Sequence, residues 1–451
     1  MPRIHPAACA AAMVIGSAVL AQPPACVNAP VRTAEFGTDP AGVQIFSLTS
    51  HLGHAWLLTR DPDGRYALQR WDGRHTPTSV QFSNTPTFLT DLLVRSFVFG
   101  EHIAVFDGSN LQTMPLAGGS LRLLPYYSPA SGALNAAAVE APAGIRLVYR
   151  GRHNVGYEAF VSSGASGDGA LLRDIVPGAE SSSPVDFVSL GGRAVFFAST
   201  PETGREPWST DGTPEGTIAL GDLNPGAESS RPSSGVPGRL LVHADRANAP
   251  LAFFIADVAV DGQASPVLFQ SDGTRGGTQR IDNVVPAVLH AAGAGVVILD
   301  GLVDQSRVPL VYDLAGRSVM TLSEWSRDLP SAPIDRAFVA GDFVYLVFKS
   351  GPTQLWSIDT RTRAANLILA ATLQQSLLIH DDAIGLDDGS LIVHALSSAR
   401  ALVRAVGATG VACTVSSTFP IRSIPSGVRD YHATRERSRV FFIAADALSQ
   451  P

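Results

Sequence analysis

The sequence is poor in cysteine, in lysine and in charge overall. Its 451 residues include three cysteines, and charged residues make up 16% of the chain. The basic residues are almost all arginine, with Lys349 as the only lysine, and no basic cluster long enough to follow a phosphate backbone occurs. The 33 basic and 40 acidic residues give a formal net charge of −7. This composition argues against nucleic acid as a partner.

Long apolar runs and sustained helical periodicity are also missing beyond the first two dozen residues. No segment there reaches the ~18 uninterrupted apolar residues that a membrane span requires. The 42 glycines and 31 prolines favour many turns that join short segments. Apolar residues nevertheless make up 45% of the chain, so a large core can form. The composition excludes a disordered chain and a coiled coil.

The N-terminus resembles a secretory signal peptide. A short apolar run over residues 6–20 follows Arg3 and ends at Val19-Leu20-Ala21, which offers small residues for cleavage. We therefore expect a signal peptide over residues 1–21 and a single mature domain over residues 22–451, secreted or periplasmic. An ordinary N-terminal helix is the alternative.

Cleavage after residue 21 removes Cys9 and leaves two cysteines, Cys26 and Cys413. They lie near the two ends of the mature chain, in a compartment where thiols oxidise. A disulfide between them and two unpaired cysteines are both consistent with the sequence. Two cysteines cannot form a structural zinc site.

The chain contains an internal repeat. Residues 156–184 align without a gap on residues 204–232, at an offset of 48, and residues 268–281 form a weaker third copy. The repeated positions of interest are Glu158, Phe160 and Asp174 in the first copy, Glu206, Trp208, Asp211, Gly212, Thr213 and Asp222 in the second, and Asp272, Gly273 and Thr274 in the third. Repeated residues are usually part of the scaffold, so we expect structural roles for them.

Short apolar segments rich in Val, Ile and Phe precede the copies and recur through the chain, as at residues 193–200, 249–257, 342–350 and 438–446. These segments are typical of β-strands. Nine Asp-Gly pairs, including Asp300-Gly301, are typical of tight hairpin turns. A repeat of about 40 to 50 residues made of short antiparallel strands predicts a β-propeller with four-stranded blades. A pair of β-sandwiches is the main alternative, but it does not explain the period.

The offset of 48 residues, divided into the mature chain, predicts seven to nine blades, with eight as the best single value. We further expect the ring to close by pairing of strands from the two chain ends. The segment 438–451 resembles the first half of a repeat, and the segment 33–48 resembles the second half. Val440–Ile443 is therefore expected to pair with a strand from Thr33–Leu48, which would remove open sheet edges.

The residues from Gly204 to Ser230 resemble the ELWxxDGT repeat of secreted and surface-associated bacterial proteins. The Asp-Gly-Thr element, the following Gly-Thr and the later Pro-Gly all match, while Pro207 stands where Leu is usual. The other copies match in part. The resemblance implies a bacterial, exported, repeat-built protein, and it implies no particular reaction.

The repeated residues have structural explanations. The aromatic residues Phe160, Trp208 and Phe269 are expected to pack between neighbouring blades. Asp211 and Asp272, each followed by Gly and Thr, are expected to form turns in which the Asp side chain binds nearby backbone amides.

Motifs for known catalytic chemistry are missing. The mature chain has no G-x-S-x-G, H-E-x-x-H, P-loop, G-x-G-x-x-G or C-x-x-C sequence. His51 and His54 are the only close histidine pair, at a strand end that does not favour metal binding. The acidic turns at residues 61–64 and 387–390 are candidate calcium sites, but solvated turns explain them better, so no cofactor is expected.

These observations favour an exported, monomeric and non-enzymatic propeller that binds a glycan or a protein through loops on one face. The alternative is a propeller enzyme, a hydrolase or lyase that acts on an extracellular polysaccharide. A purely structural adhesion repeat is the third possibility.

Overall fold

A computed structural model of the chain consists almost entirely of short antiparallel strands. It describes residues 44–442 except 52–53, 61–62, 64, 72–77, 82–94, 108, 130–133, 166, 231–239, 244–249, 261–262, 331, 350–351, 371–377, 380–383, 386–388, 397–399, 417–432 and 437–438. The expected signal peptide, Cys26 and the side chain of Cys413 lie outside the described part. Among the described residues, no helix has the length and apolar character that a membrane crossing requires.

The strands fall into sheets of consecutive segments. The first four sheets contain β1 (Gln44–His51), β2 (His54–Arg60), β3 (Tyr66–Trp71) and β4 (Thr78–Gln81); β5 (Arg95–Phe99), β6 (His102–Phe106), β7 (Leu111–Pro115) and β8 (Arg122–Leu123); β9 (Ala136–Ala141), β10 (Gly144–His153), β11 (Gly156–Ser162) and β12 (Ala170–Arg173); and β13 (Val185–Ser189), β14 (Ala194–Thr200), β15 (Gly204–Thr210) and β16 (Ile218–Ala219).

The next four sheets contain β17 (Leu240–His243), β18 (Leu251–Val260), β19 (Gln263–Ser271) and β20 (Gln279–Ile281); β21 (Pro286–Gly293), β22 (Val296–Val303), β23 (Ser306–Asp313) and β24 (Ser318–Thr321); β25 (Ile334–Ala340), β26 (Phe343–Phe348), β27 (Gln354–Asp359) and β28 (Ala365–Ala370); and β29 (Leu378–Ile379), β30 (Ile384–Gly385), β31 (Ser390–Leu396), β32 (Arg400–Val406) and β33 (Val411–Ser416). The short helix α1 (Leu322–Trp325) follows β24, and β34 (Ala433–Glu436) pairs with β35 (Arg439–Phe442).

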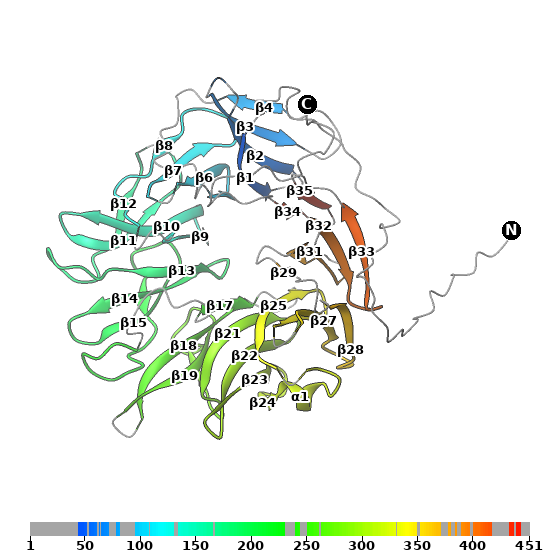
Figure 1. Cartoon of the computed structure of the whole chain (residues 1–451). Helices are drawn as coiled ribbons and strands as arrows, with labels where there is room; N and C mark the ends of the chain where they lie inside the picture. Colours follow the sequence, from blue (N-terminus) through cyan, green and yellow to red (C-terminus); the bar gives the residue numbers. More distant parts are fainter. Residues whose placement is uncertain are drawn as a thin grey trace.

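The sheets are arranged radially around a ring, with the first strand of each sheet nearest the centre and the last at the rim (Figure 1). Seven described sheets have four strands, and the eighth has five. All strand pairs are antiparallel, and the four-stranded sheets pair in chain order. The predicted β-propeller is therefore confirmed, and a pair of sandwiches is excluded.

The second strand of a sheet is buried on both faces because a sheet lies on either side of it. In β14, every residue from Ala194 to Ala198 is fully buried. Phe196 packs in the core shared with the third sheet, whereas Phe197 packs with Phe254 of the fifth sheet. Successive side chains of a strand point to opposite faces, so adjacent phenylalanines serve two different inter-sheet cores.

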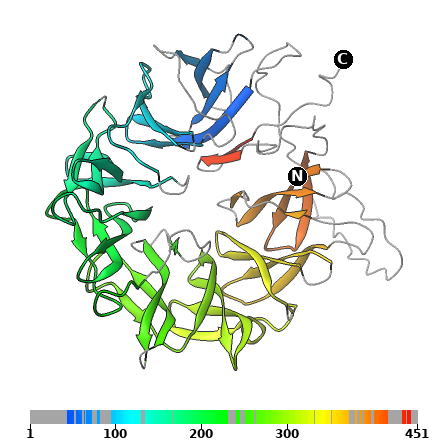
Figure 2. The ribbon, with the colours of Figure 1, turned by 60° about the vertical axis from the view of Figure 1, so that its left-hand side comes forward.

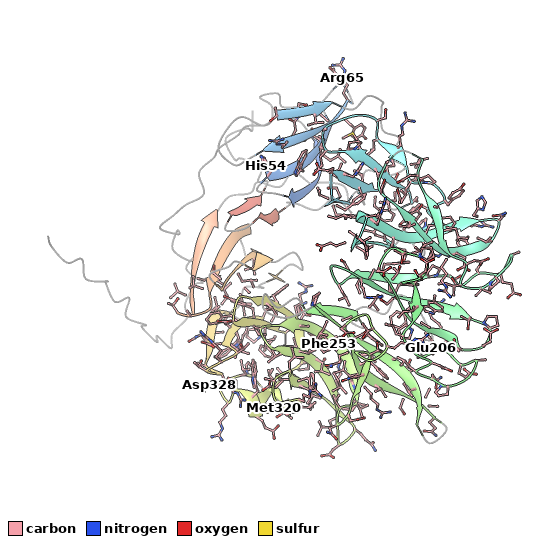
Figure 3. All side chains as sticks on the ribbon, turned by 180° about the vertical axis from the view of Figure 1, so that it is seen from behind. His54, Arg65, Glu206, Phe253, Met320 and Asp328 are labelled. Carbon is pink, nitrogen blue, oxygen red and sulfur yellow. The ribbon has the colours of Figure 1, made fainter. Side chains whose placement is uncertain are left out.

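The repeated aromatic residue lies on the third strand of its sheet and packs against the preceding sheet. Phe160 of β11 contacts the cluster that contains Ala104 of β6. Trp208 of β15 packs with Val139 of β9 in the same way, and Phe269 packs in the cluster of the fourth and fifth sheets. Side chains fill the spaces between the sheets around the described ring (Figure 3).

The ring closes through the C-terminal hairpin. Strand β34 contacts β1 on one side and β30 on the other, and Figure 2 shows this hairpin between the first and eighth sheets. The two chain ends meet as expected, but the strand pairing differs, because among the described residues Gln44–Leu48 pairs with β2 alone and Val440–Phe442 with β34 alone. The rest of the expected N-terminal partner, residues 33–43, lies outside the described part.

Replacement of Trp208 by alanine is expected to lower the free energy of unfolding by about 3 to 5 kcal/mol. The indole is 8% exposed and lies in the core between the third and fourth sheets, so its loss leaves a cavity in an inter-sheet interface. Chemical denaturation measures the change. Leu367→Ala is the control, because this side chain is 45% exposed and its loss is expected to change stability by less than about 0.5 kcal/mol. Equal stability of the two variants would contradict the interpretation.

Candidate functional site

The antiparallel order gives the ring two loop faces. We call upper the face that carries the turns between second and third strands, such as β10–β11 and β14–β15, together with the connections from one sheet to the next. The repeated glutamates lie near this face. Glu158 accepts hydrogen bonds from the backbone N–H groups of Ile175 (3.0 Å) and Ser182 (2.8 Å). Glu206 accepts the equivalent bonds from Leu223 and Ser230, both at 2.9 Å.

These two carboxyl groups hold the connection that leads to the next sheet. Asp174 and Asp222 add a bond each within the same connections, from the N–H groups of Gly178 (3.3 Å) and Gly226 (3.1 Å). Burial raises the pKa of Glu206 to about 7, against the hydrogen bonds of Leu223 and Ser230 that lower it. Such contacts organise a loop, so the glutamates have a structural explanation in their own geometry.

The Asp-Gly-Thr elements lie on the opposite face, between third and fourth strands. The Asp211 carboxylate accepts hydrogen bonds from the N–H (3.0 Å) and the hydroxyl (2.6 Å) of Thr213, and Asp272 binds Thr274 at 2.8 and 2.7 Å. Gly212 and Gly273 have φ angles of +84° and +83°, a conformation that glycine adopts without strain. The side chains bind their own turns, and these residues form no catalytic cluster.

The candidate metal sites fall mostly outside the described part. His54 and Asp63 are described, but His54 has no described His51 side chain beside it, and residues 61, 387 and 388 are not described. Within the described residues, no three His, Cys, Asp or Glu side chains gather as a metal site requires. The calcium hypothesis stays a prediction.

A different group of residues forms the candidate site. His290 lies on β21, the first strand of the sixth sheet, and β21 contacts the first strands β17 and β25 of the neighbouring sheets. The register of β21 against β22 shifts between Leu289 and Ala291, so His290 is the extra residue of a β-bulge. A bulge of this kind redirects a side chain. Among the described first strands, β21 alone has two such irregularities, the other lying between Pro286 and Val288.

The bulge places the His290 imidazole against a buried carboxylate. His290 Nε2 lies 3.2 Å from Asp300 Oδ2, although the direction of approach does not meet hydrogen-bond geometry. Arg307 of β23 donates two hydrogen bonds to the same oxygen, from Nε at 2.9 Å and Nη2 at 2.6 Å. Asp300 is 1% exposed. Burial raises the pKa of this carboxyl, but the contacts and charges of His290 and Arg307 outweigh it and hold the pKa below its ordinary value.

Besides Nε2, two polar atoms of this group make no hydrogen bond in the described structure. The second Asp300 oxygen, Oδ1, is buried and accepts no hydrogen bond in the described structure. His290 Nδ1 has no described partner either, yet it is not enclosed, and 9% of the side chain is exposed. One ring nitrogen thus faces an ionised carboxylate while the other is open. This is the arrangement of an imidazole that can accept a proton.

Sequence reasoning missed this group and misinterpreted one member. Asp300-Gly301 was expected to form a hairpin turn, but both residues lie inside β22, paired with β21 and β23. Gly301 is required by packing, because a Cβ there would lie 2.5 Å from the Leu310 side chain and 2.8 Å from the Val285 carbonyl oxygen. One signal in the sequence could have identified this group. Asp300 lies within an apolar segment, and a buried charge needs a partner.

No protein-family model and no curated protein sequence matches the chain. Solved structures similar to it include a puromycin hydrolase (16% identity, TM-score 0.38) and a Mycobacterium tuberculosis puromycin-hydrolyzing peptidase (14% identity, TM-score 0.34). The similarity to the puromycin hydrolase covers 86% of this chain and 58% of that one. The similarity to the peptidase covers 82% of this chain and 60% of that one. The β-propeller domain of the Pyrococcus furiosus trilobed protease is also similar (12% identity, TM-score 0.35), with 83% of this chain and 98% of that one covered.

This result corrects the expectation of a propeller without chemistry of its own. Two of these three structures are of puromycin-hydrolysing enzymes and the third is of the propeller domain of a protease, whereas the expectation was of a non-enzymatic binding protein. The low identities and TM-scores assign no residue of this chain to a residue of those proteins.

Titration of Glu206 is expected to make stability depend on pH. Because its pKa is about 7 in the folded chain and 4.5 in the unfolded chain, the folded state holds the proton more tightly. The stabilisation is complete below about pH 4.5 and is lost as the pH rises through about 7. Chemical denaturation across this range should show a smaller loss in Glu206→Gln than in the parent. The exposed Glu202→Gln is the control, and equal slopes for all three proteins would contradict the assignment.

Proposed function

We propose that this chain is a hydrolase in which His290 acts as the general base. The observation that carries the proposal is the second bulge of β21, which turns His290 onto the buried Asp300. The first strands of the other described sheets lack this second bulge, so the repeated fold does not require it. Bulges are frequent beside active sites, where they aim a side chain.

Asp300 and Arg307 are positioning residues in this proposal. Arg307 binds one oxygen of Asp300 twice and keeps the carboxylate ionised and fixed. The carboxylate stabilises the imidazolium that forms when His290 accepts a proton. The exposed Nδ1 is the nitrogen that meets water, because Nε2 faces Asp300.

The reaction is the addition of water to a carbonyl carbon. His290 takes a proton from water, and the oxygen adds to the carbonyl carbon to give a tetrahedral intermediate. The bond from this carbon to the leaving nitrogen or oxygen then breaks, and the imidazolium returns the proton to the leaving group. One water is consumed and the imidazole is regenerated, so atoms and charge balance.

The residue types favour amides and esters over glycosides. Glycoside hydrolysis commonly uses two carboxyl groups about 5 to 10 Å apart, one of them protonated. The site combines an imidazole with a single carboxylate, and that carboxylate is held ionised. A polysaccharide substrate is therefore the less favoured form of the enzymatic alternative.

His290→Gln is expected to lower kcat/KM for fluorogenic peptidyl amides by at least 10²-fold, the lower end of what a general base contributes. Glutamine keeps a polar group beside Asp300, so melting temperature should change little.

The control is His102→Gln, a partly buried histidine on β6, which should keep the wild-type rate. Absence of hydrolysis of amides and esters by the wild-type chain would overturn the proposal. So would a His290→Gln protein that hydrolyses them at the wild-type rate.

A further inference from the structure

A buried arginine occupies a core position of the third sheet. Arg150 of β10 is 8% exposed. It lies one residue past the ladder partner of Phe160, and Phe197 lies one residue past the ladder partner of Trp208, so Arg150 and Phe197 occupy equivalent positions. Phe197 is fully buried in the core between the fourth and fifth sheets. An apolar side chain therefore satisfies the fold at this position, and packing does not require the charge of Arg150.

The guanidinium of Arg150 is engaged along one side only. Its Nη1 donates hydrogen bonds to the carbonyl oxygens of Ser128 (3.2 Å) and Pro129 (2.9 Å). The other edge of the group carries Nε and Nη2. Nε is buried and donates no hydrogen bond in the part of the chain that the structure describes, and Nη2 donates none there either but is not enclosed. One edge of a buried cation is thus open.

No carboxylate among the described residues forms an ion pair with Arg150. Burial lowers the pKa of Arg150, and the positive charge of Arg205 in the fourth sheet lowers it further, whereas Tyr157 and Tyr127 raise it. A buried charge without a counter-ion is costly. An anion at the open edge would offset that cost.

Arg152 brings a second guanidinium to the same place. Arg150 and Arg152 are two residues apart on β10, so they lie on the same face of the strand. This is the face of Val148, which packs in the core shared with the fourth sheet. The ring centre of Tyr157 lies 4.0 Å from Cζ of Arg150 and 5.1 Å from Cζ of Arg152. One aromatic ring therefore holds two like charges together through cation–π contacts.

The sixth sheet shows what this edge of an arginine binds in the same protein. Arg307 binds the Asp300 carboxylate through Nε (2.9 Å) and Nη2 (2.6 Å), the two nitrogens that are open in Arg150. These N–H groups form a rigid fork that matches the oxygens of a carboxylate or a phosphate. The chemistry of the open edge thus favours an oxyanion.

We infer that Arg150 and Arg152 form an oxyanion-binding site near the upper face of the third sheet, which takes a carboxylate or phosphate group of a ligand. The Arg150 guanidinium binds the group through its open edge. The exposed Arg152 supplies the second positive charge, and Tyr157 positions both side chains. The site lies in another sheet than His290, and the inference does not rest on the proposed function.

The test measures binding of inorganic phosphate and of glucuronate to the full chain by calorimetry, at constant ionic strength, with glucose as the neutral probe. We expect at least one of the two anions to bind and to raise the melting temperature, because it binds the folded state alone. Glucose should do neither. The anion that binds more tightly tells whether a phosphate or a carboxylate is the preferred group.

Arg150→Lys is expected to weaken anion binding at least tenfold, because lysine keeps the charge but loses the fork. Arg152→Gln should weaken it about threefold, as loss of an exposed charge does. Arg152 is exposed, so this second variant should keep the melting temperature of the anion-free protein even if Arg150→Lys does not.

Arg146→Gln is the matched control. It removes one positive charge from the same strand and the same face, but at the other end of β10, and it should leave binding unchanged. Absence of binding of both anions, binding of glucose, or equal weakening by Arg146→Gln and Arg152→Gln would overturn the inference. So would an Arg150→Lys protein with a lower melting temperature and unchanged anion affinity, since Arg150 would then be a structural residue only.

Discussion

Burial of both faces of every sheet is the constraint on which the rest of the structure depends. A blade of four short strands has no inside of its own, and it becomes stable only when a sheet packs on each face. The fully buried second strands show this, since adjacent residues such as Phe196 and Phe197 belong to two different cores. Each interface also needs a large side chain to fill it, which the repeat supplies as Phe160 or Trp208. The same demand makes closure necessary, and β34 meets it by lying against β1.

The rims of the ring are free of this constraint. A repeat must keep its inter-sheet core, but its loops can shorten or change once another contact holds the connection. In the two copies of the repeat that align best, Glu158 and Glu206 hold the connection to the next sheet. The second sheet has Asn110 in place of that carboxylate, and the Tyr149 hydroxyl binds the connection instead. The site at His290 lies where a sheet departs from the repeat, which is where side chains are no longer needed by the scaffold.

The sequence predicted the fold well because the fold follows from periodicity. A repeat of 48 residues with short apolar strands is a property that one chain displays openly. The strands around Phe196, Phe253 and Val344 were predicted in the same way, and they lie in the fourth, fifth and seventh sheets. The closure was harder to predict. The expected partner strand was chosen because Val43–Leu48 resembles a later strand of the repeat, whereas strands pair with their neighbours in space, and β1 pairs with β2.

The candidate site could not be predicted for a different physical reason. Asp-Gly favours a turn locally, but at Asp300-Gly301 tertiary packing overrides this preference, since Gly301 allows Leu310 and the Val285 carbonyl to approach. A buried carboxylate is costly to leave unpaired, and removal of one partner from a buried ion pair costs more than the pair contributes. Asp300 therefore needs a cationic neighbour, which Arg307 of β23 supplies, and the bulge of β21 adds His290 on the other side. Arg307 alone neutralises the carboxylate charge and binds only one of its oxygens. The charge balance of the fold thus requires no imidazole at this position, and the bulge that brings His290 there is better explained by chemistry than by stability.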